Sequence, residues 1–255
     1  MLRLRERGSR AVRAIGKRPL VLCYHAASAT WVHSLSVPGQ EIANHVSWFL
    51  KKGYRPGKGE DVISGTGRVL HITFDDAFVS VAQALPLLED LGVRATVFVC
   101  SGLADQGREL DVPELAHEAE THPEELRTLD WEALRELAER GHAIGSHTIT
   151  HPHLSRLSDE EIERELYLSK AQIEQEIGRP CLFLAYPYGD HDARVREVAR
   201  RAGYLAAFGL PGDRSFRDPF LLPRAGIWRG NGRPRVWLKT SAAGHALSAW
   251  RRGGP

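Results

Sequence analysis

Short apolar runs alternate with amphipathic helical patterns along most of the chain, and this alternation constrains the fold more than any other feature. Six runs rich in β-branched residues predict buried strands, and a weaker seventh lies at 220–227; the six span residues 19–25, 68–74, 95–100, 142–147, 182–187 and 204–209. Five helical patterns end at a glycine, the residue that most often closes a helix, namely Gly53, Gly92, Gly141, Gly178 and Gly203. Such alternation predicts a largely parallel sheet with right-handed crossovers.

The number of repeats indicates a barrel. About seven strand–helix units without a glycine-rich phosphate loop fit an α/β fold, a distorted (β/α) barrel of parallel strands, better than an open dinucleotide-binding sheet. The 255 residues suffice for one such domain, which we expect over residues 19–240, between a basic N-terminal arm (1–18) and a C-terminal tail (241–255). Residues 101–127 are polar and interrupt the alternation, so we expect them to cross one mouth of the barrel.

The arm differs in charge from the rest of the chain. It carries seven basic residues and one acidic residue, a net charge of +6, whereas the whole chain carries +2, which leaves −4 for the remainder. An acidic remainder argues against a nucleic-acid partner. Apolar residues between the charges would allow weak contact with an anionic membrane surface, although a solvated terminus is the simpler interpretation; they are Leu2, Leu4, Val12 and Ile15.

Three further features bear on the compartment. The cysteines, Cys23, Cys100 and Cys181, are odd in number and lie in or beside apolar runs, which is typical of buried free thiols in a reducing compartment. No apolar run approaches the roughly 20 residues of a membrane span. The N-terminus lacks the apolar stretch of a secretory signal. We therefore expect a cytoplasmic protein, with a peripheral contact at the inner face of the membrane as an alternative.

Polar residues follow the predicted strands at one end. The first strand ends in Tyr24-His25, the second in Asp75-Asp76, the fourth in Ser146-His147 and the fifth in Tyr186-Pro187-Tyr188-Gly189, and the weak seventh strand carries Arg224. Because chemistry in parallel α/β folds gathers at the carboxyl ends of the strands, we expect these side chains to converge on one mouth.

This set of residues includes a candidate metal site. His147 and His151, together with one of the two aspartates, would supply two imidazoles and a carboxylate, which suffice for a catalytic zinc ion. Pro152 disfavours helical backbone at His151, so a tight loop is expected there, and His153 is expected to be only a polar neighbour. The alternatives are a helix cap for the aspartates and a polar turn for the histidines.

Three segments also resemble a known family. HITFDD (71–76), GSHTITHPHLSRLS (145–158) and FLAYPYG (183–189) resemble motifs of the NodB-like polysaccharide deacetylases, carbohydrate esterase family four, and their order and spacing match over residues 19–227. The resemblance implies a distorted (β/α) barrel that removes acetyl groups from sugars with a divalent metal, usually Zn²⁺, with Co²⁺ or Ni²⁺ as alternatives. It further implies a role for each motif residue: Asp75 as general base, Asp76, His147 and His151 as metal ligands, and the backbone N–H of Tyr188 as an oxyanion donor.

The chain departs from the family pattern at three places. Ala77 replaces a glycine, Ala185 replaces an arginine, and the C-terminal Leu-x-His that supplies the acid is missing. The chain instead resembles the branch that includes the poly-N-acetylglucosamine deacetylases, in which a Tyr-His near the N-terminus takes the place of the acid. We therefore predict that His25 is the acid, with a pKa little shifted from its ordinary value, and that Arg224 pairs with Asp75. The only histidine of the C-terminal region, His245, is predicted to have no role.

These features predict a metal-dependent hydrolase that removes acetyl groups from a carbohydrate, N-acetyl rather than O-acetyl. Two alternatives stay open. One is an inactive sugar-binding barrel. The other is a non-haem Fe(II) enzyme, because two histidines and a carboxylate also bind that metal.

Overall fold

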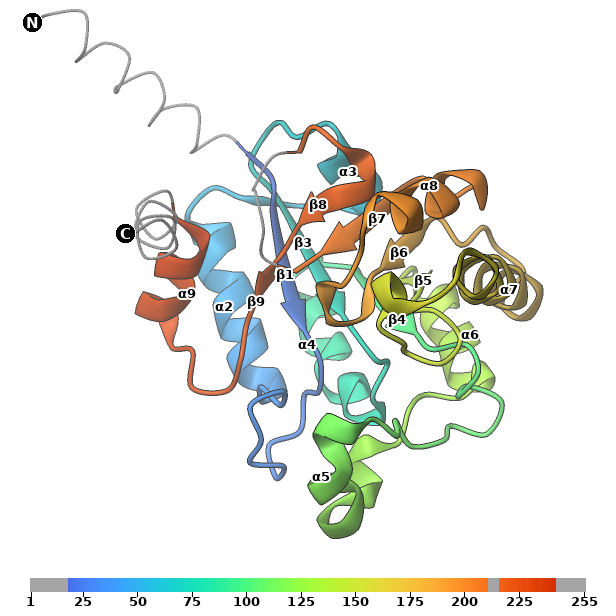
Figure 1. Ribbon diagram of the computed structural model, residues 1–255. Helices are drawn as coiled ribbons and strands as arrows, with labels where there is room; N and C mark the ends of the chain where they lie inside the picture. The colour runs from blue at the N-terminus through green and yellow to red at the C-terminus, as the bar shows by residue number, and fades with distance from the viewer. Residues whose placement is uncertain (1–17, 211–215, 242–255) are drawn as a thin grey trace, which may run out of the picture.

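The computed structural model describes residues 18–210 and 216–241 (Figure 1). Within them the strands are β1 (Leu20–Tyr24), β2 (Arg55–Pro56), β3 (Val69–Phe74), β4 (Ala95–Val99), β5 (Ala143–Ser146), β6 (Phe183–Ala185), β7 (Ala206–Gly209), β8 (Leu222–Pro223) and β9 (Ala225–Gly226). The helices are α2 (Gly39–Lys51), α3 (Gly59–Ile63), α4 (Leu85–Asp90), α5 (Ala116–Thr121), α6 (Trp131–Glu139), α7 (Asp159–Ile177), α8 (Ala193–Arg201) and α9 (Arg233–Thr240). Short 3-10 turns lie at Val79–Gln83, Pro113–Leu115, Pro123–Leu126, Leu154–Arg156, Pro187–Gly189 and Pro219–Leu221.

The strands form one parallel sheet that nearly closes on itself. Their order is β8-β7-β6-β5-β4-β3-β1-β9, with β2 beside β3. β8 and β9 stand at opposite ends of this order, yet only Arg224 separates them along the chain. One stretch of chain therefore pairs with β7 on one side and β1 on the other (Figure 1). The predicted parallel barrel is confirmed, and the single strand expected at 220–227 is instead two short strands flanking Arg224.

The two-residue period of the strands decides which side chains fill the barrel. An apolar cluster occupies the interior and includes Val21, Val69, Phe98, Phe183, Ala185 and Phe208. A larger cluster lies between the strands and the helices, and it contains the alternate residues of the same strands, such as Leu22 and Leu70. Because successive side chains point to opposite faces, Cys23 follows Val21 into the interior, and Thr73 and Asp75 follow Val69.

Helix boundaries follow the predicted signals. Asp130 caps α6 by accepting a hydrogen bond from the N–H of Ala133, and Ser158 caps α7 in a capping box with Glu161. The five helix-ending glycines all have left-handed backbone, with φ between 68° and 90°. The helical pattern that ends at Gly92 forms a 3-10 turn at Val79–Gln83 followed by α4, and not one continuous helix. Pro86, in the first turn of α4, has no N–H to continue a helix from the preceding turn.

Residues 101–127 cross the carboxyl ends of the strands, as expected. Their buried apolar side chains pack against residues that directly follow β1, β3 and β4; the cluster contains Ala26, Trp31, Phe78, Cys100, Leu110, Val112, Leu115 and Leu126. Figure 1 shows α5 beyond the tips of the strand arrows. This crossing segment therefore forms part of the wall of the mouth where β1, β3 and β5 end.

Two predictions on chain organisation concern the termini. The basic arm lies outside the described residues except for Arg18, and the tail lies outside them except for Ser241. Among the described residues, no helix is both long enough and apolar enough to cross a membrane. All three cysteines are free and buried, as predicted.

Candidate active site

The parallel sheet brings the predicted site residues to one mouth. His25 follows β1, Asp75 and Asp76 follow β3, and His147 follows β5. All four side chains are at most 8% exposed. The turn that contains His151 has no helical hydrogen-bonding pattern and is left-handed at His151, with a φ of 62°. The expected tight loop is therefore present.

Asp76, His147 and His151 form a buried cluster of potential metal ligands. The Nε2 atoms of His147 and His151 lie 3.5 Å and 3.4 Å from Oδ1 of Asp76. One potential ligand atom from each residue lies within 4.8 Å of the others. Asp76 adopts a left-handed φ of 66°, and the following Ala77 a φ of 50°. A glycine would take this conformation without the steric cost that Ala77 bears.

The protonation pattern of this cluster fits a cation. Nδ1 of His147 lies 2.8 Å from the carbonyl oxygen of Ala185 and must donate to it, so a neutral ring presents a lone pair at Nε2. That lone pair faces Oδ1 of Asp76, which has no hydrogen-bond partner among the described residues. Burial, and then the charge of Asp75, raise the pKa of Asp76 well above its ordinary value. Burial lowers the pKa of both histidines, that of His151 to about 2. A metal ion between these atoms would stabilise the ionised form of Asp76, which burial otherwise disfavours, and would bind the lone pairs of the neutral rings.

Asp75 is held apart from this cluster by Arg224. The guanidinium forms a bidentate ion pair with the carboxylate, with Nη1–Oδ1 at 2.6 Å and Nη2–Oδ2 at 2.8 Å. It also donates to Thr73 and lies over the rings of Phe98 and Phe208. Burial alone would raise the pKa of Asp75, but Arg224 outweighs it and holds the pKa well below its ordinary value. The predicted pairing is present, and it leaves Asp75 ionised.

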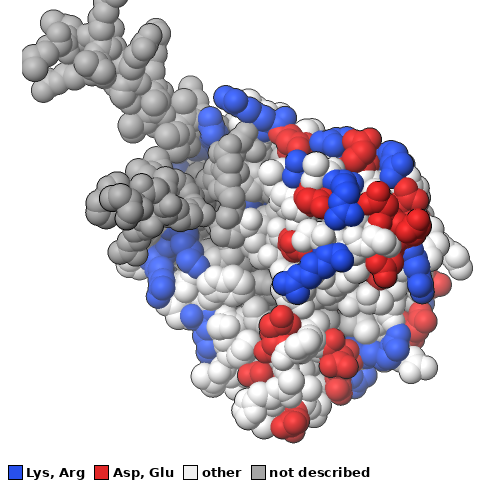
Figure 2. All heavy atoms as spheres, in the orientation of Figure 1, with Lys and Arg blue, Asp and Glu red and all other residues white. Residues whose placement is uncertain are grey.

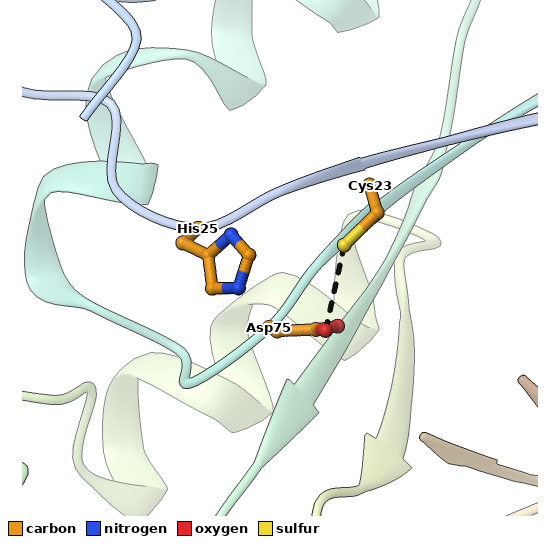
Figure 3. A group of neighbouring side chains, drawn as sticks. All are labelled: Cys23, His25 and Asp75. Carbon is orange, nitrogen blue, oxygen red and sulfur yellow. Dashed lines mark hydrogen bonds between the residues drawn. The ribbon is translucent and has the colours of Figure 1, made fainter. Parts of the chain in front are cut away.

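Cys23 also contacts this carboxylate. Its thiol lies 3.4 Å from Oδ2 of Asp75. Figure 3 shows the nitrogen-bearing edge of His25 turned toward both residues. The three side chains are close enough to bind an ion. However, both Asp75 oxygens already accept hydrogen bonds from Arg224, and burial raises the pKa of the Cys23 thiol well above its ordinary value. We interpret Cys23 as a hydrogen-bond donor to Asp75. The sequence indicated only that the thiol is buried.

His25 lies against Trp228. The two rings stack with centroids 5.1 Å apart, and Nδ1 of His25 has no hydrogen-bond partner among the described residues. Burial lowers the pKa of His25 to about 4. The expectation of a nearly ordinary pKa is therefore wrong, because the ring is enclosed by the barrel mouth and by Trp228. His25 is neutral near pH 7.

Tyr188 lies beside the second histidine of the cluster. Its backbone is left-handed, with a φ of 58°, inside the turn that follows β6. Its ring contacts that of His151 and stacks on His153 at 4.0 Å, and its hydroxyl donates to Glu114 of the crossing segment. His153 is outside the ligand cluster, as expected.

Helix α7 holds the histidine loop in place. Glu165 accepts hydrogen bonds from the backbone N–H groups of Ile149 and Thr150, at 2.7 Å and 3.1 Å, and from the Thr150 hydroxyl at 2.8 Å. One turn further along, Ser169 donates to the carbonyl of Thr148. Sequence reasoning missed both residues. Two polar residues on the buried face of α7, four positions apart, are the signal that could have revealed them.

The fold and this site define an α/β barrel protein with a buried carboxylate–histidine centre at the carboxyl ends of its strands. A profile of the family described as "Polysaccharide deacetylase" matches residues 63–207, more than half of the chain. The chain belongs to the polysaccharide deacetylase family, and its barrel is a NodB-like domain, as the resemblance implied. The parallel sheet also differs from the antiparallel double sheet on which the Fe(II) alternative usually depends.

Individual relatives and structures agree with this assignment. The "Putative polysaccharide deacetylase YxkH" of Bacillus subtilis is 26% identical over 192 residues, which are 72% of this chain and 61% of that protein. The "Peptidoglycan-N-acetylglucosamine deacetylase" of Bacillus cereus is 27% identical over 139 residues, 54% of each chain. The chain thus spans less than two thirds of these relatives.

Solved structures share the fold. The Streptococcus pyogenes deacetylase PplD, in complex with acetate, has a TM-score of 0.73 and 20% identity, and the match covers 88% of this chain and 98% of that chain. IcaB from Ammonifex degensii has a TM-score of 0.73 and 21% identity, and the match covers 89% of this chain and 98% of that chain.

Proposed function

We propose that the protein is a metal-dependent hydrolase that removes N-acetyl groups from a carbohydrate. The observation that carries this proposal is the facing arrangement of acceptors on Asp76, His147 and His151, beside an ionised Asp75 that is not needed as a ligand. The N-acetyl preference is supported by the relative of Bacillus cereus, whose name specifies N-acetylglucosamine.

Asp76, His147 and His151 would hold one divalent cation, with zinc as the first candidate because it prefers nitrogen and oxygen donors in such sets. When bound, this cation acidifies water and polarises a carbonyl group. The carbonyl of Ala185 fixes the ring of His147 in the required tautomer, and Glu165 fixes the loop between the two histidines.

Asp75 and His25 divide the proton transfers. Asp75 accepts a proton from the attacking water, and Arg224 orients the carboxylate and keeps it ionised until then. The C–N bond breaks as the nitrogen receives a proton, which gives acetate and a free amine. His25, neutral at rest, receives the proton that Asp75 took from the water and delivers it to the nitrogen, and a ring nitrogen of His25 lies within 4.8 Å of a carboxylate oxygen of Asp75. The N–H of Tyr188 stabilises the developing oxyanion.

An acetate-release screen tests this proposal. The full chain, supplied with zinc, is incubated with N-acetylated chito-oligosaccharides and with O-acetylated sugars, and acetate is measured. Release from the N-acetylated substrates is expected. Release from the O-acetylated sugars alone would contradict the amide assignment, and binding of chito-oligosaccharides without release of acetate would favour the inactive sugar-binding barrel.

A further inference from the structure

The charge of the chain divides into an acidic body and two basic ends. Residues 19–218 contain 20 basic and 31 acidic residues, a net charge of −11. Residues 219–255 contain seven basic residues and no acidic residue. The N-terminal arm is therefore not the only basic part, and the second basic part includes α9, which the structure describes.

Helix α9 presents apolar and basic side chains together to solvent. Trp237 is 50% exposed and Leu238 is 40% exposed, while Arg233 and Arg235 are exposed on the same short helix. Val236 alone on this helix is fully buried. An exposed tryptophan and leucine flanked by basic residues are typical of helices that lie in a membrane interface.

The arginines of α9 also differ from the three arginines at exposed positions of α8, in the acidic body. Arg194, Arg200 and Arg201 of α8 all form ion pairs with acidic side chains. Among the described parts of the chain, Arg233 and Arg235 form none. Figure 2 shows basic and acidic atoms side by side over α7 and α8, whereas basic atoms over α9 have no acidic atoms beside them in this view. Positive charge without internal partners is complementary to an anionic surface.

We infer that α9 is a docking surface for an anionic lipid membrane. Trp237 and Leu238 would enter the interface, and Arg233 and Arg235 would contact the lipid phosphates. The apolar pair favours a lipid surface over a soluble polyanion, because two exposed apolar side chains gain nothing from a fully hydrated partner.

The helix is firmly joined to the barrel beside the active site. Nζ of Lys239 donates to the carbonyl of Gly226 in β9 at 2.9 Å and lies over the ring of Trp228 at 5.8 Å. Trp228 in turn stacks on His25. Docking through α9 would therefore hold the barrel, and not a mobile appendage, at the membrane.

Vesicle co-sedimentation of the full chain tests the inference. The vesicles are phosphatidylcholine alone or phosphatidylcholine with 30% phosphatidylglycerol added. Binding is expected only to the anionic vesicles and should weaken with salt. Arg233→Glu/Arg235→Glu should weaken it by about tenfold or more, because each basic residue near the surface contributes about 1 kcal/mol. Trp237→Ala/Leu238→Ala should weaken it by a similar factor, because it removes the apolar area that would enter the interface.

The matched control is Tyr167→Ala/Leu168→Ala on α7, which removes two side chains of similar exposure, 40% and 53%, from the acidic body. Its vesicle binding should equal that of the unmodified chain. All variants should release acetate from a soluble chito-oligosaccharide at the same rate, which separates this inference from the proposed function. Unchanged binding by both α9 variants would overturn the inference, as would equal binding to neutral vesicles or stronger binding to soluble dextran sulfate.

Discussion

At the scale of single residues, the pairing of Asp75 with Arg224 links stability to chemistry. Both side chains are almost completely buried, at 2% and 0% exposure. Removing one partner of a buried ion pair leaves an uncompensated charge and costs roughly 3–5 kcal/mol. A loss of activity on mutation of Asp75 can therefore come from the missing base or from the lower stability of the fold, and experiments can separate these two causes.

We predict that Asp75→Asn retains its metal but releases acetate ~10²–10⁴-fold more slowly, the usual size of a general-base contribution. It should also be less stable, because Arg224 loses its ionic partner. The double variant Asp75→Asn/Arg224→Met should recover stability in denaturant titration and stay inactive. Turnover near that of the unmodified chain in folded, metal-loaded Asp75→Asn would exclude Asp75 as the base.

His25 is predicted to matter most for poor leaving groups. His25→Ala should retain its metal and lose most activity on amides, whereas an activated acetyl ester, whose leaving group needs no proton, should lose less. The control is His245→Ala, in the part of the chain outside the described residues, which should be nearly silent. Equal losses on both substrates would argue against His25 as the acid. An inactive His245→Ala with an active His25→Ala would reverse the assignment.

At the scale of elements, α7 determines the shape of the histidine loop. The loop has left-handed backbone at Thr148 and at His151, conformations that non-glycine residues adopt only when their surroundings impose them. The hydrogen bonds from this loop to Glu165 and Ser169 supply that constraint.

Glu165→Ala is therefore predicted to weaken metal binding, although Glu165 is not a ligand. The loop would lose its acceptors, and zinc affinity should fall by ~10–100-fold, the usual effect of a supporting residue. Glu165→Gln, which retains an acceptor oxygen, should recover part of this affinity. Glu160→Ala, an exposed change on the same helix, is the control. Competition titration with a chromophoric chelator measures the affinities, and equal values for Glu165→Ala and Glu160→Ala would refute the role.

The strands and long helices were predictable because they carry their period over several residues. β1 and β3 lie within the runs 19–25 and 68–74, and α7 ends at its predicted glycine, Gly178. Elements of two residues, such as β2, β8 and β9, are too short to show a period. Helix α9 was missed for a related reason, since it spans eight residues and contains Pro234.

The residues of the site that belong to sequence motifs were predictable, whereas the properties that depend on packing between distant segments were not. The sequence placed Asp76, His147 and His151 at one mouth because parallel strands end together, and it anticipated the contact of Arg224 with Asp75. It could not give the pKa of His25, which depends on burial under Trp228, a residue about 200 positions away in the sequence. It could not give the bond from Cys23 to Asp75 either, because that bond depends on the register of β1 against β3.

At the scale of the whole molecule, the barrel interior is partly polar, and this makes its stability depend on pH. His71 points into the interior, bonded to the carbonyl of Gly57 and to Thr96, and burial lowers its pKa from 6.5 to about 4. The unfolded chain therefore binds a proton at this position between pH 6.5 and 4, whereas the folded chain does not.

We predict that His71 reduces stability as the pH falls through this window. Above pH 6.5 the ring is neutral in both states and has no effect, and below pH 4 it is charged in both states. The difference in unfolding free energy between the unmodified chain and His71→Asn should therefore change by up to ~3 kcal/mol between these limits. Denaturant titrations at several pH values measure it. If the unfolding free energies of the two proteins changed with pH in the same way, His71 would have its ordinary pKa in the folded chain.

The central claim is that Asp76, His147 and His151 bind one divalent cation on which deacetylation depends. The most direct measurement is a zinc titration of chelator-stripped protein, followed by acetate release from a chito-oligosaccharide and by elemental analysis. Activity should rise from near zero and level off at about one zinc per chain, and folded His147→Ala should neither retain zinc nor gain activity. Full activity in the stripped protein, or one retained zinc per chain in His147→Ala, would contradict the account.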